Sequence, residues 1–137
     1  IFPDAKANRT AQPAEGAALD DLDLPPPAFI KMDIQGAEIL ALRGMRRTLA
    51  ESKDVCLLTE FWPYGLREAG FEPEELIDEL ARAGLDIRQV TPDLRLAPVR
   101  RESAASECGF GLGTYVNFAA AKPDRMKSLE KSLGVRP

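Results

Sequence analysis

Two carboxylates in this sequence stand near the ends of apolar stretches, where a strand would deliver them to a ligand. Asp33 lies in the stretch 29–34 and Glu60 in the stretch 55–61. The chain contains no histidine, which excludes histidine metal sites, Ser-His and Cys-His nucleophile pairs, and histidine as a general base. A proton acceptor must therefore be a carboxylate, Lys, Tyr or Cys, and Asp33 and Glu60 are the candidate catalytic residues.

The segments that carry these two acids have the patterns of buried strands. The stretch 29–34 is apolar apart from two charged residues, which is typical of a strand buried on both faces of a parallel sheet, and 55–61 predicts a second such strand. Between them the apolar residues recur at steps of three and four, which predicts one amphipathic helix over 37–49. Because ligands bind at the carboxyl ends of strands in open α/β sheets, we expect Asp33 and Glu60 to face one crevice.

The remaining elements are predicted from the same patterns. We expect either one helical turn or a short extended apolar segment within 19–24. Helices are predicted over 73–84 and 123–133, strands over 85–90 and 114–121, and irregular segments over 62–66 and 92–113. Strands that alternate with helices imply right-handed crossovers and a mostly parallel sheet. No helical pattern separates the last two strands, so we expect them to be antiparallel neighbours, with the last strand reversed.

Composition sets the class of protein. The 137 residues suffice for one domain, and 45% hydrophobic with 29% charged residues is the balance of a globular protein. A net charge of -4 gives no attraction to nucleic acid or to an anionic membrane. No apolar run approaches the ~20 residues of a membrane span, and the first residues lack a signal-peptide pattern. The two cysteines form no disulfide framework, and no metal site is predicted. We therefore expect a cytoplasmic protein.

A family resemblance rests on three segments. Residues 30–38, with the sequence Ile-Lys-Met-Asp-Ile-Gln-Gly-Ala-Glu, are followed by Leu42-Arg43-Gly44. This segment resembles the hallmark of the FkbM family of S-adenosylmethionine-dependent methyltransferases, although Gln35 stands where Glu is most usual. The upstream Leu-Asp-Asp-Leu at 19–22 and the downstream Leu-Leu-Thr-Glu-Phe at 57–61 resemble the family's flanking motifs, in the same order.

The resemblance implies a Rossmann-like class I methyltransferase sheet, with S-adenosyl-L-methionine as the cofactor. It implies that Asp33, Gly36 and Glu38 bind the cofactor. An alternative remains open for each acid: Asp33 caps the turn at Gly36 by accepting backbone N–H groups, and Glu38 is favoured in the first helical turn by the helix dipole.

The resemblance also implies an O-methyltransferase whose acceptor is a hydroxyl group on a sugar or a secondary metabolite, that is, a small molecule or a glycan. Trp62 and Tyr64, next to Glu60, are the candidate substrate-binding residues because aromatic rings stack on sugar rings and on adenine. Alternatively, both rings only cover the end of the sheet.

The first half of such a domain has no counterpart in the sequence. The glycine cluster at 109–113 precedes a strand, whereas a nucleotide loop must lead directly into a helix. We therefore expect an irregular lead-in over 1–18, a partial methyltransferase domain over 19–134 that lacks the first strands and the cofactor loop, and a tail over 135–137.

A partial sheet has consequences for association. The strand at 29–34 would be an exposed edge, so we expect the chain to be part of a longer protein or to pair with another copy or another chain. The alternative function is a non-catalytic α/β relic or an interaction module that uses this edge.

Overall fold

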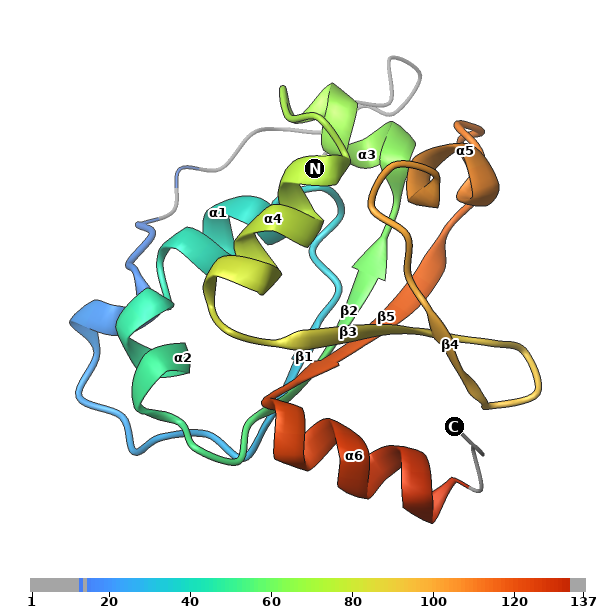
Figure 1. Cartoon of the computed structure of the whole chain (residues 1–137). Helices are drawn as coiled ribbons and strands as arrows, with labels where there is room; N and C mark the ends of the chain where they lie inside the picture. Colours follow the sequence, from blue (N-terminus) through green and yellow to red (C-terminus); the bar gives the residue numbers. More distant parts are fainter. Residues whose placement is uncertain (1–12, 14, 134–137) are drawn as a thin grey trace.

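The computed structural model describes Pro13 and residues 15–133. The expected lead-in over 1–18 lies largely outside the described residues, and the expected tail over 135–137 lies wholly outside them. The strands are β1 (Phe29–Met32), β2 (Cys56–Phe61), β3 (Asp86–Val90), β4 (Leu96–Pro98) and β5 (Val116–Ala121). The helices are the 3-10 helix η1 (Leu19–Asp21), α1 (Glu38–Arg43), α2 (Arg46–Glu51), α3 (Pro63–Glu68), α4 (Glu74–Arg82), α5 (Ala104–Cys108) and α6 (Pro123–Ser132) (Figure 1).

The five described strands form one mixed α/β sheet in the order β1-β2-β5-β3-β4. The pair β1–β2 is parallel, whereas β5 is antiparallel to both β2 and β3, and β4 is antiparallel to β3. The predicted antiparallel pairing of β3 with β5, with the last strand reversed, is confirmed. The prediction of a mostly parallel sheet is wrong, because β5 inserts between two strands that would otherwise be parallel neighbours and β4 adds a hairpin.

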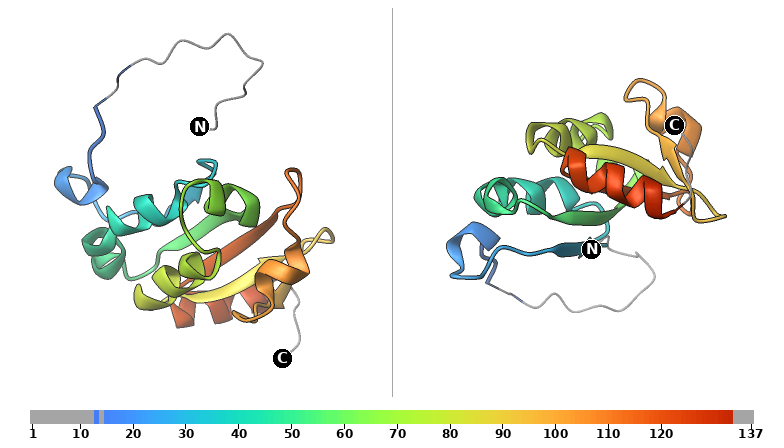
Figure 2. Two further views of the ribbon diagram at one scale, coloured as in Figure 1. Left: turned by 90° about the horizontal axis from the view of Figure 1, so that it is seen from above. Right: turned by 60° about the horizontal axis from the view of Figure 1, so that its bottom comes forward.

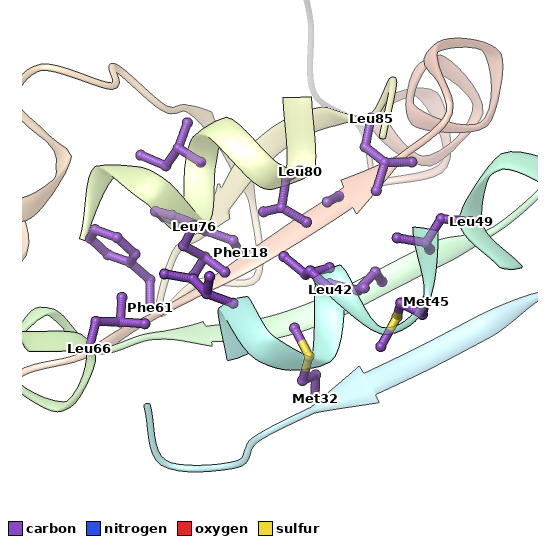
Figure 3. Packing of buried hydrophobic residues seen from close by; sticks show 14 of the residues in the cluster. Met32, Leu42, Met45, Leu49, Phe61, Leu66, Leu76, Leu80, Leu85 and Phe118 are labelled. Atoms are coloured by element: carbon purple, nitrogen blue, oxygen red, sulfur yellow. The ribbon is translucent and has the colours of Figure 1, made fainter. Parts of the chain in front are cut away.

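Helices cover both faces of the sheet, with α1, α2 and α4 on one side and α6 on the other (Figure 1). The alternation of side chains along β5 supplies both layers: Phe118 and Ala120 face the larger core, and Ala119 and Ala121 face Met126 of α6. In the larger core, the Phe61 and Phe118 rings stack with centroids 4.6 Å apart (Figure 3). Full burial stabilises each such large apolar side chain by about 1.5–3 kcal/mol.

The helix predicted over 37–49 is two helices, α1 and α2, because the chain leaves the helical path at Gly44 and Met45. The carboxylate of Asp20 explains the new start. It accepts the backbone N–H groups of Arg47 and Thr48, both at 2.8 Å, and the Thr48 hydroxyl at 2.7 Å. The predicted turn within 19–24 is therefore η1, which lies beside α2 (Figure 2) and caps it from a distance in sequence.

Two segments predicted to be irregular contain short elements. Residues 62–66 belong largely to α3, which begins at Pro63, a residue suited to the first helical position. The Trp62 ring lies so close to Gly65 that a Cβ added there would sit 2.0 Å from its Cε3 atom. The segment 92–113 contains β4 and α5, which are short elements whose stability comes from packing on the sheet and not from a periodic pattern.

The strand β1 lies at one edge of the described sheet and has no described neighbour on its outer side. Its Phe29 side chain is 59% exposed, and Ile34 and Leu24 nearby are also exposed. The expected pairing of this edge with another copy or chain stays a prediction. None of the described helices is long and apolar enough to cross a membrane.

Candidate functional site

The parallel pairing of β1 with β2 brings the two candidate carboxylates to one edge of the sheet. The last paired residues are Met32 and Thr59, so Asp33 and Glu60 each come one residue later, at the same level. Asp33 is exposed and its two carboxylate oxygens contact Lys31 Nζ at 3.2 Å and Gln35 Nε2 at 3.4 Å. Exposed contacts of this kind contribute little to stability, so the Asp33 side chain is accessible to a ligand.

The turn after β1 has an unusual backbone. Gln35 and Gly36 have positive φ values of 58° and 95°, which lie in the left-handed region. Glycine adopts that region freely, so Gly36 lets the chain reverse from β1 into α1 over two residues. The backbone at Gly36 consequently lies close to the carboxyl end of β1, where Asp33 also lies.

Glu38 takes part in the same turn. Its side chain is buried, and its Oε1 atom accepts the backbone N–H of Ile34 at 3.1 Å. The residue also begins α1, where the partial positive charge of the helix amino terminus favours a carboxylate. Both observations place Glu38 as a support of the turn that carries Asp33.

Glu60 is half-buried at the end of β2. Burial raises the pKa of its carboxyl above the ordinary value, the negative charges of Asp33 and Glu38 raise it further, and the charge of Lys31 opposes them. Three carboxylates thus interact at this edge against one ammonium group. A carboxyl with a raised pKa can accept and return a proton more readily near neutral pH than an ordinary glutamate can.

The two candidate substrate-binding residues, Trp62 and Tyr64, follow Glu60 along the chain, at the start of α3. The ring centroids of Trp62 and Tyr64 are 5.7 Å apart, and the Trp62 ring is buried against Gly65. Trp62 lines a shallow cavity of about 220 Å³, and Tyr64 does not. The other lining residues are Gln35, Glu60, Leu112, Gly113 and Tyr115.

The sequence analysis missed four residues of this cavity, namely Gln35, Leu112, Gly113 and Tyr115. The register of β5 explains the position of Tyr115. Val116 pairs with Phe61, so Tyr115, the residue before β5, comes next to Trp62. A signal was present in the length of the segment 92–113, since long loops in compact domains are commonly functional. It did not indicate which strand end the segment would reach.

The charges at this edge can be compared with a methyl donor of the S-adenosylmethionine type. Such a donor carries a sulfonium, an ammonium and a carboxylate group and is positively charged overall, and the excess of carboxylates at Asp33, Glu38 and Glu60 is complementary to that charge. Asp33, the exposed carboxylate of the three, therefore fits the ammonium group at the methionine end of the donor. The glycines at 109–113 lie between α5 and β5, so among the described residues they do not form a strand-to-helix nucleotide loop. No group of three or more potential metal ligands comes together among the described residues.

These features define an α/β protein whose candidate ligand site lies at the carboxyl ends of adjacent parallel strands. A family model described as the methyltransferase FkbM domain matches residues 6–87, more than half of the chain, and the chain belongs to this family of methyltransferases. FkbM methyltransferases use S-adenosylmethionine. The matched residues include Asp33, Glu38, Glu60 and Trp62, and the match ends before β4, α5 and β5. Neither a curated protein nor a solved structure matches the chain.

Proposed function

We propose that the chain serves in S-adenosylmethionine-dependent O-methylation of a hydroxyl group on a sugar or a secondary metabolite. The observation that carries the proposal is the cluster of Asp33, Glu38 and Glu60 at the end of β1 and β2, within the segment that the family model matches. The acceptor class follows from the family resemblance, and the cavity beside Glu60 is compatible with it.

Each acid has a different role in this proposal. S-adenosylmethionine supplies a methyl group on a positively charged sulfur. Asp33, which is exposed, contacts the positively charged methionine end, and the Gly36 turn lets the backbone approach it closely. Glu38 holds the turn from within. Glu60 accepts the proton of the acceptor hydroxyl as the oxygen bonds to the methyl carbon and the carbon–sulfur bond breaks.

The aromatic pair has a supporting role. Trp62 lines the cavity next to Glu60 and contributes its edge to the acceptor site. Tyr64 lies behind it and positions its ring. Placement of the hydroxyl in line with the methyl group supplies most of the rate gain in such a transfer, so these contacts matter through geometry.

The test uses calorimetric titration with S-adenosylhomocysteine. We expect saturable one-site binding to the wild-type chain, which requires that the missing first strands be dispensable or supplied by a second copy, and binding at least tenfold weaker for Asp33→Asn. Asp124→Asn, which changes an exposed acid on α6, should bind as the wild type does. No binding to the folded wild-type chain, or equal binding by Asp33→Asn, would contradict the assignment of Asp33.

Turnover separates the role of Glu60 from that of Asp33. With an accepted hydroxyl compound, Glu60→Gln should bind S-adenosylhomocysteine normally and lose about 10²- to 10⁴-fold in kcat. A variant with unchanged kcat would show that Glu60 does not accept the proton.

A second candidate function rests on the edge of the sheet. The outer side of β1 has no described neighbour, and Phe29 beside it is 59% exposed, which suits strand addition by a second copy or another chain. Sedimentation distinguishes the two: a stable monomer that binds S-adenosylhomocysteine would contradict the edge as the functional surface.

A further inference from the structure

We infer that the segment 109–115 is the acceptor-recognising wall of the site, and that Tyr115 stacks on a hydroxylated six-membered ring whose hydroxyl points to Glu60. The inference rests on the proposed function and names the substrate class of that same site. A pyranose sugar and a phenol share the recognised chemistry, which is a flat apolar face with a polar edge.

The cavity has two chemically different walls. Gln35 and Glu60, at the ends of β1 and β2, offer an amide and a carboxyl that can hydrogen bond to hydroxyl groups. Leu112 and Tyr115, which come from the segment before β5 on the other side of β2 from β1, contribute apolar surface to the same cavity. A ligand that satisfies both walls needs a polar edge and an apolar face, and a hydroxylated ring provides them.

The size of the cavity agrees with a single ring. Its volume is about 220 Å³, and a water molecule occupies about 30 Å³ in the liquid. The shallow space is therefore several times larger than one water, which is the scale of a single six-membered ring.

Large apolar side chains are exposed along this segment. Phe110 and Tyr115 are 44% and 55% exposed, and Leu112 is 71% exposed. Leu112 and Tyr115 line the cavity, and Phe110 adds a third exposed apolar side chain within six positions of the chain. Together they form an apolar surface that a ligand can cover. Single exposed apolar residues elsewhere on the protein carry no such meaning.

The segment is held in place, so it can act as a built wall. The Thr114 N–H and hydroxyl both donate to the Gly111 carbonyl, at 3.1 and 2.8 Å. The Arg67 guanidinium of α3 lies 4.3 Å from the centroid of the Phe110 ring, a cation–π contact that ties the segment to α3. The backbone position of Tyr115 is set by its neighbour Val116, which begins β5 and pairs with Phe61.

The wall lies outside the part of the chain that the family model matches, which ends at residue 87. The acids at the ends of β1 and β2 lie inside it. This division assigns methyl-donor chemistry to the shared segment and acceptor choice to the segment 109–115 of this chain.

Trp62 provides the readout, because it is the only tryptophan of the chain and it lines the cavity. We would saturate the full chain with S-adenosylhomocysteine and titrate it separately with methyl α-D-glucopyranoside and with 4-methylphenol, while recording Trp62 emission. A saturable change with at least one probe is expected, and the responding probe identifies a sugar or a phenol as the source. No saturable change with either probe would overturn the inference.

Variants make the test specific. Tyr115→Ala should weaken binding of the ring probe at least tenfold. Tyr115→Phe, which keeps the ring, should bind the probe within about threefold of the wild-type affinity. Leu112→Ser should also weaken binding, whereas Leu94→Ser, which changes an equally exposed leucine on the turn between β3 and β4, should not. Wild-type affinity in Tyr115→Ala would refute the stacking role.

The outcomes also separate this inference from the proposed function. Calorimetry with S-adenosylhomocysteine should give the same affinity for Tyr115→Ala and for the wild type. If the wild type binds a ring probe through Tyr115 but never binds S-adenosylhomocysteine, the ring site stands and the methyltransferase assignment of this chain fails. If the wild type binds S-adenosylhomocysteine but neither ring probe, the methyltransferase assignment stands and the ring site fails.

Discussion

The buried carboxylate of Glu79 gives the sharpest stability prediction. Its side chain is 3% exposed and lies between three guanidinium groups. Arg43 Nε lies 2.8 Å from its carboxylate, an Arg46 nitrogen 3.0 Å and an Arg82 nitrogen 2.9 Å, so Glu79 joins α4 to both α1 and α2. Substitution by glutamine keeps the shape and removes the charge, so Glu79→Gln isolates the electrostatic contribution.

The magnitude follows from the pKa of Glu79. Burial raises this pKa, but the hydrogen bonds from Arg43 and Arg46 and the charges of Arg46 and Arg82 outweigh burial and lower it from 4.5 to about 2. Lowering the pKa by this amount corresponds to about 3 kcal/mol, since one pKa unit is about 1.4 kcal/mol. The guanidinium side chains are 38% to 63% exposed, so solvent screens the pairs. We therefore expect Glu79→Gln to cost about 2 kcal/mol at pH 7.

The dependence on pH has a definite sign. Because the folded-state pKa lies below the ordinary value, the stabilisation is present above about pH 4.5 and is lost as pH falls toward 2. Urea unfolding at pH 7 and near pH 2 should show a difference of about 2 kcal/mol between wild type and Glu79→Gln that vanishes in acid. Glu75→Gln, which changes a more exposed partner of Arg43, should cost less than about 1 kcal/mol. A difference between wild type and Glu79→Gln that is absent at pH 7, or that persists near pH 2, would refute the reasoning.

Two further predictions concern local packing. Asp20→Ala should destabilise the protein by about 1–2 kcal/mol because it removes the cap of α2, whereas Asp21→Ala next to it should have little effect; chemical denaturation measures both. Gly65→Ala should cost about 1–3 kcal/mol and shift Trp62 emission, because the new Cβ would lie 2.0 Å from the indole ring. Gly16→Ala, with open space around the position, is its control, and equal melting temperatures for the two variants would contradict the close approach.

The sequence predicted the elements whose apolar residues form a clear pattern, although the expected burial of β1 on both faces is wrong, since β1 is an edge strand with Phe29 exposed. The strands β1 and β2, the helices α4 and α6, and the antiparallel pairing of β3 with β5 all follow from apolar periodicity and from the absence of a helix before β5. The break between α1 and α2 could not be predicted this way, since it depends on Asp20, which is 27 residues before Arg47. The same limit applies to β4, whose three residues carry too little pattern to identify a strand.

In the candidate site, too, the residues that follow from local sequence were predicted, and those placed by tertiary packing were missed. Asp33 and Glu60 were found because Asp33 directly follows one apolar strand and Glu60 lies near the end of another, and the residues at the end of a strand can be identified from its own sequence. Leu112, Gly113 and Tyr115 were missed because their position depends on which strand β5 pairs with. That choice is made by tertiary packing, in which Phe118 stacks on Phe61, and no local pattern contains it.

The reversed strand is also the reason that the site has two walls. In a fully parallel sheet, the edge that holds Asp33 and Glu60 would receive only residues that follow a strand. Because β5 runs antiparallel beside β2, this edge also receives Tyr115, which precedes a strand, at the level of Trp62. The antiparallel direction of β5 therefore brings the segment 109–115, which lies beyond the family match, to the edge that holds Asp33 and Glu60. The backbone pairing of β5 with β2 fixes this placement. If the segment 109–115 recognises the acceptor as we propose, acceptor preference can be changed there without altering the strands that hold the acids.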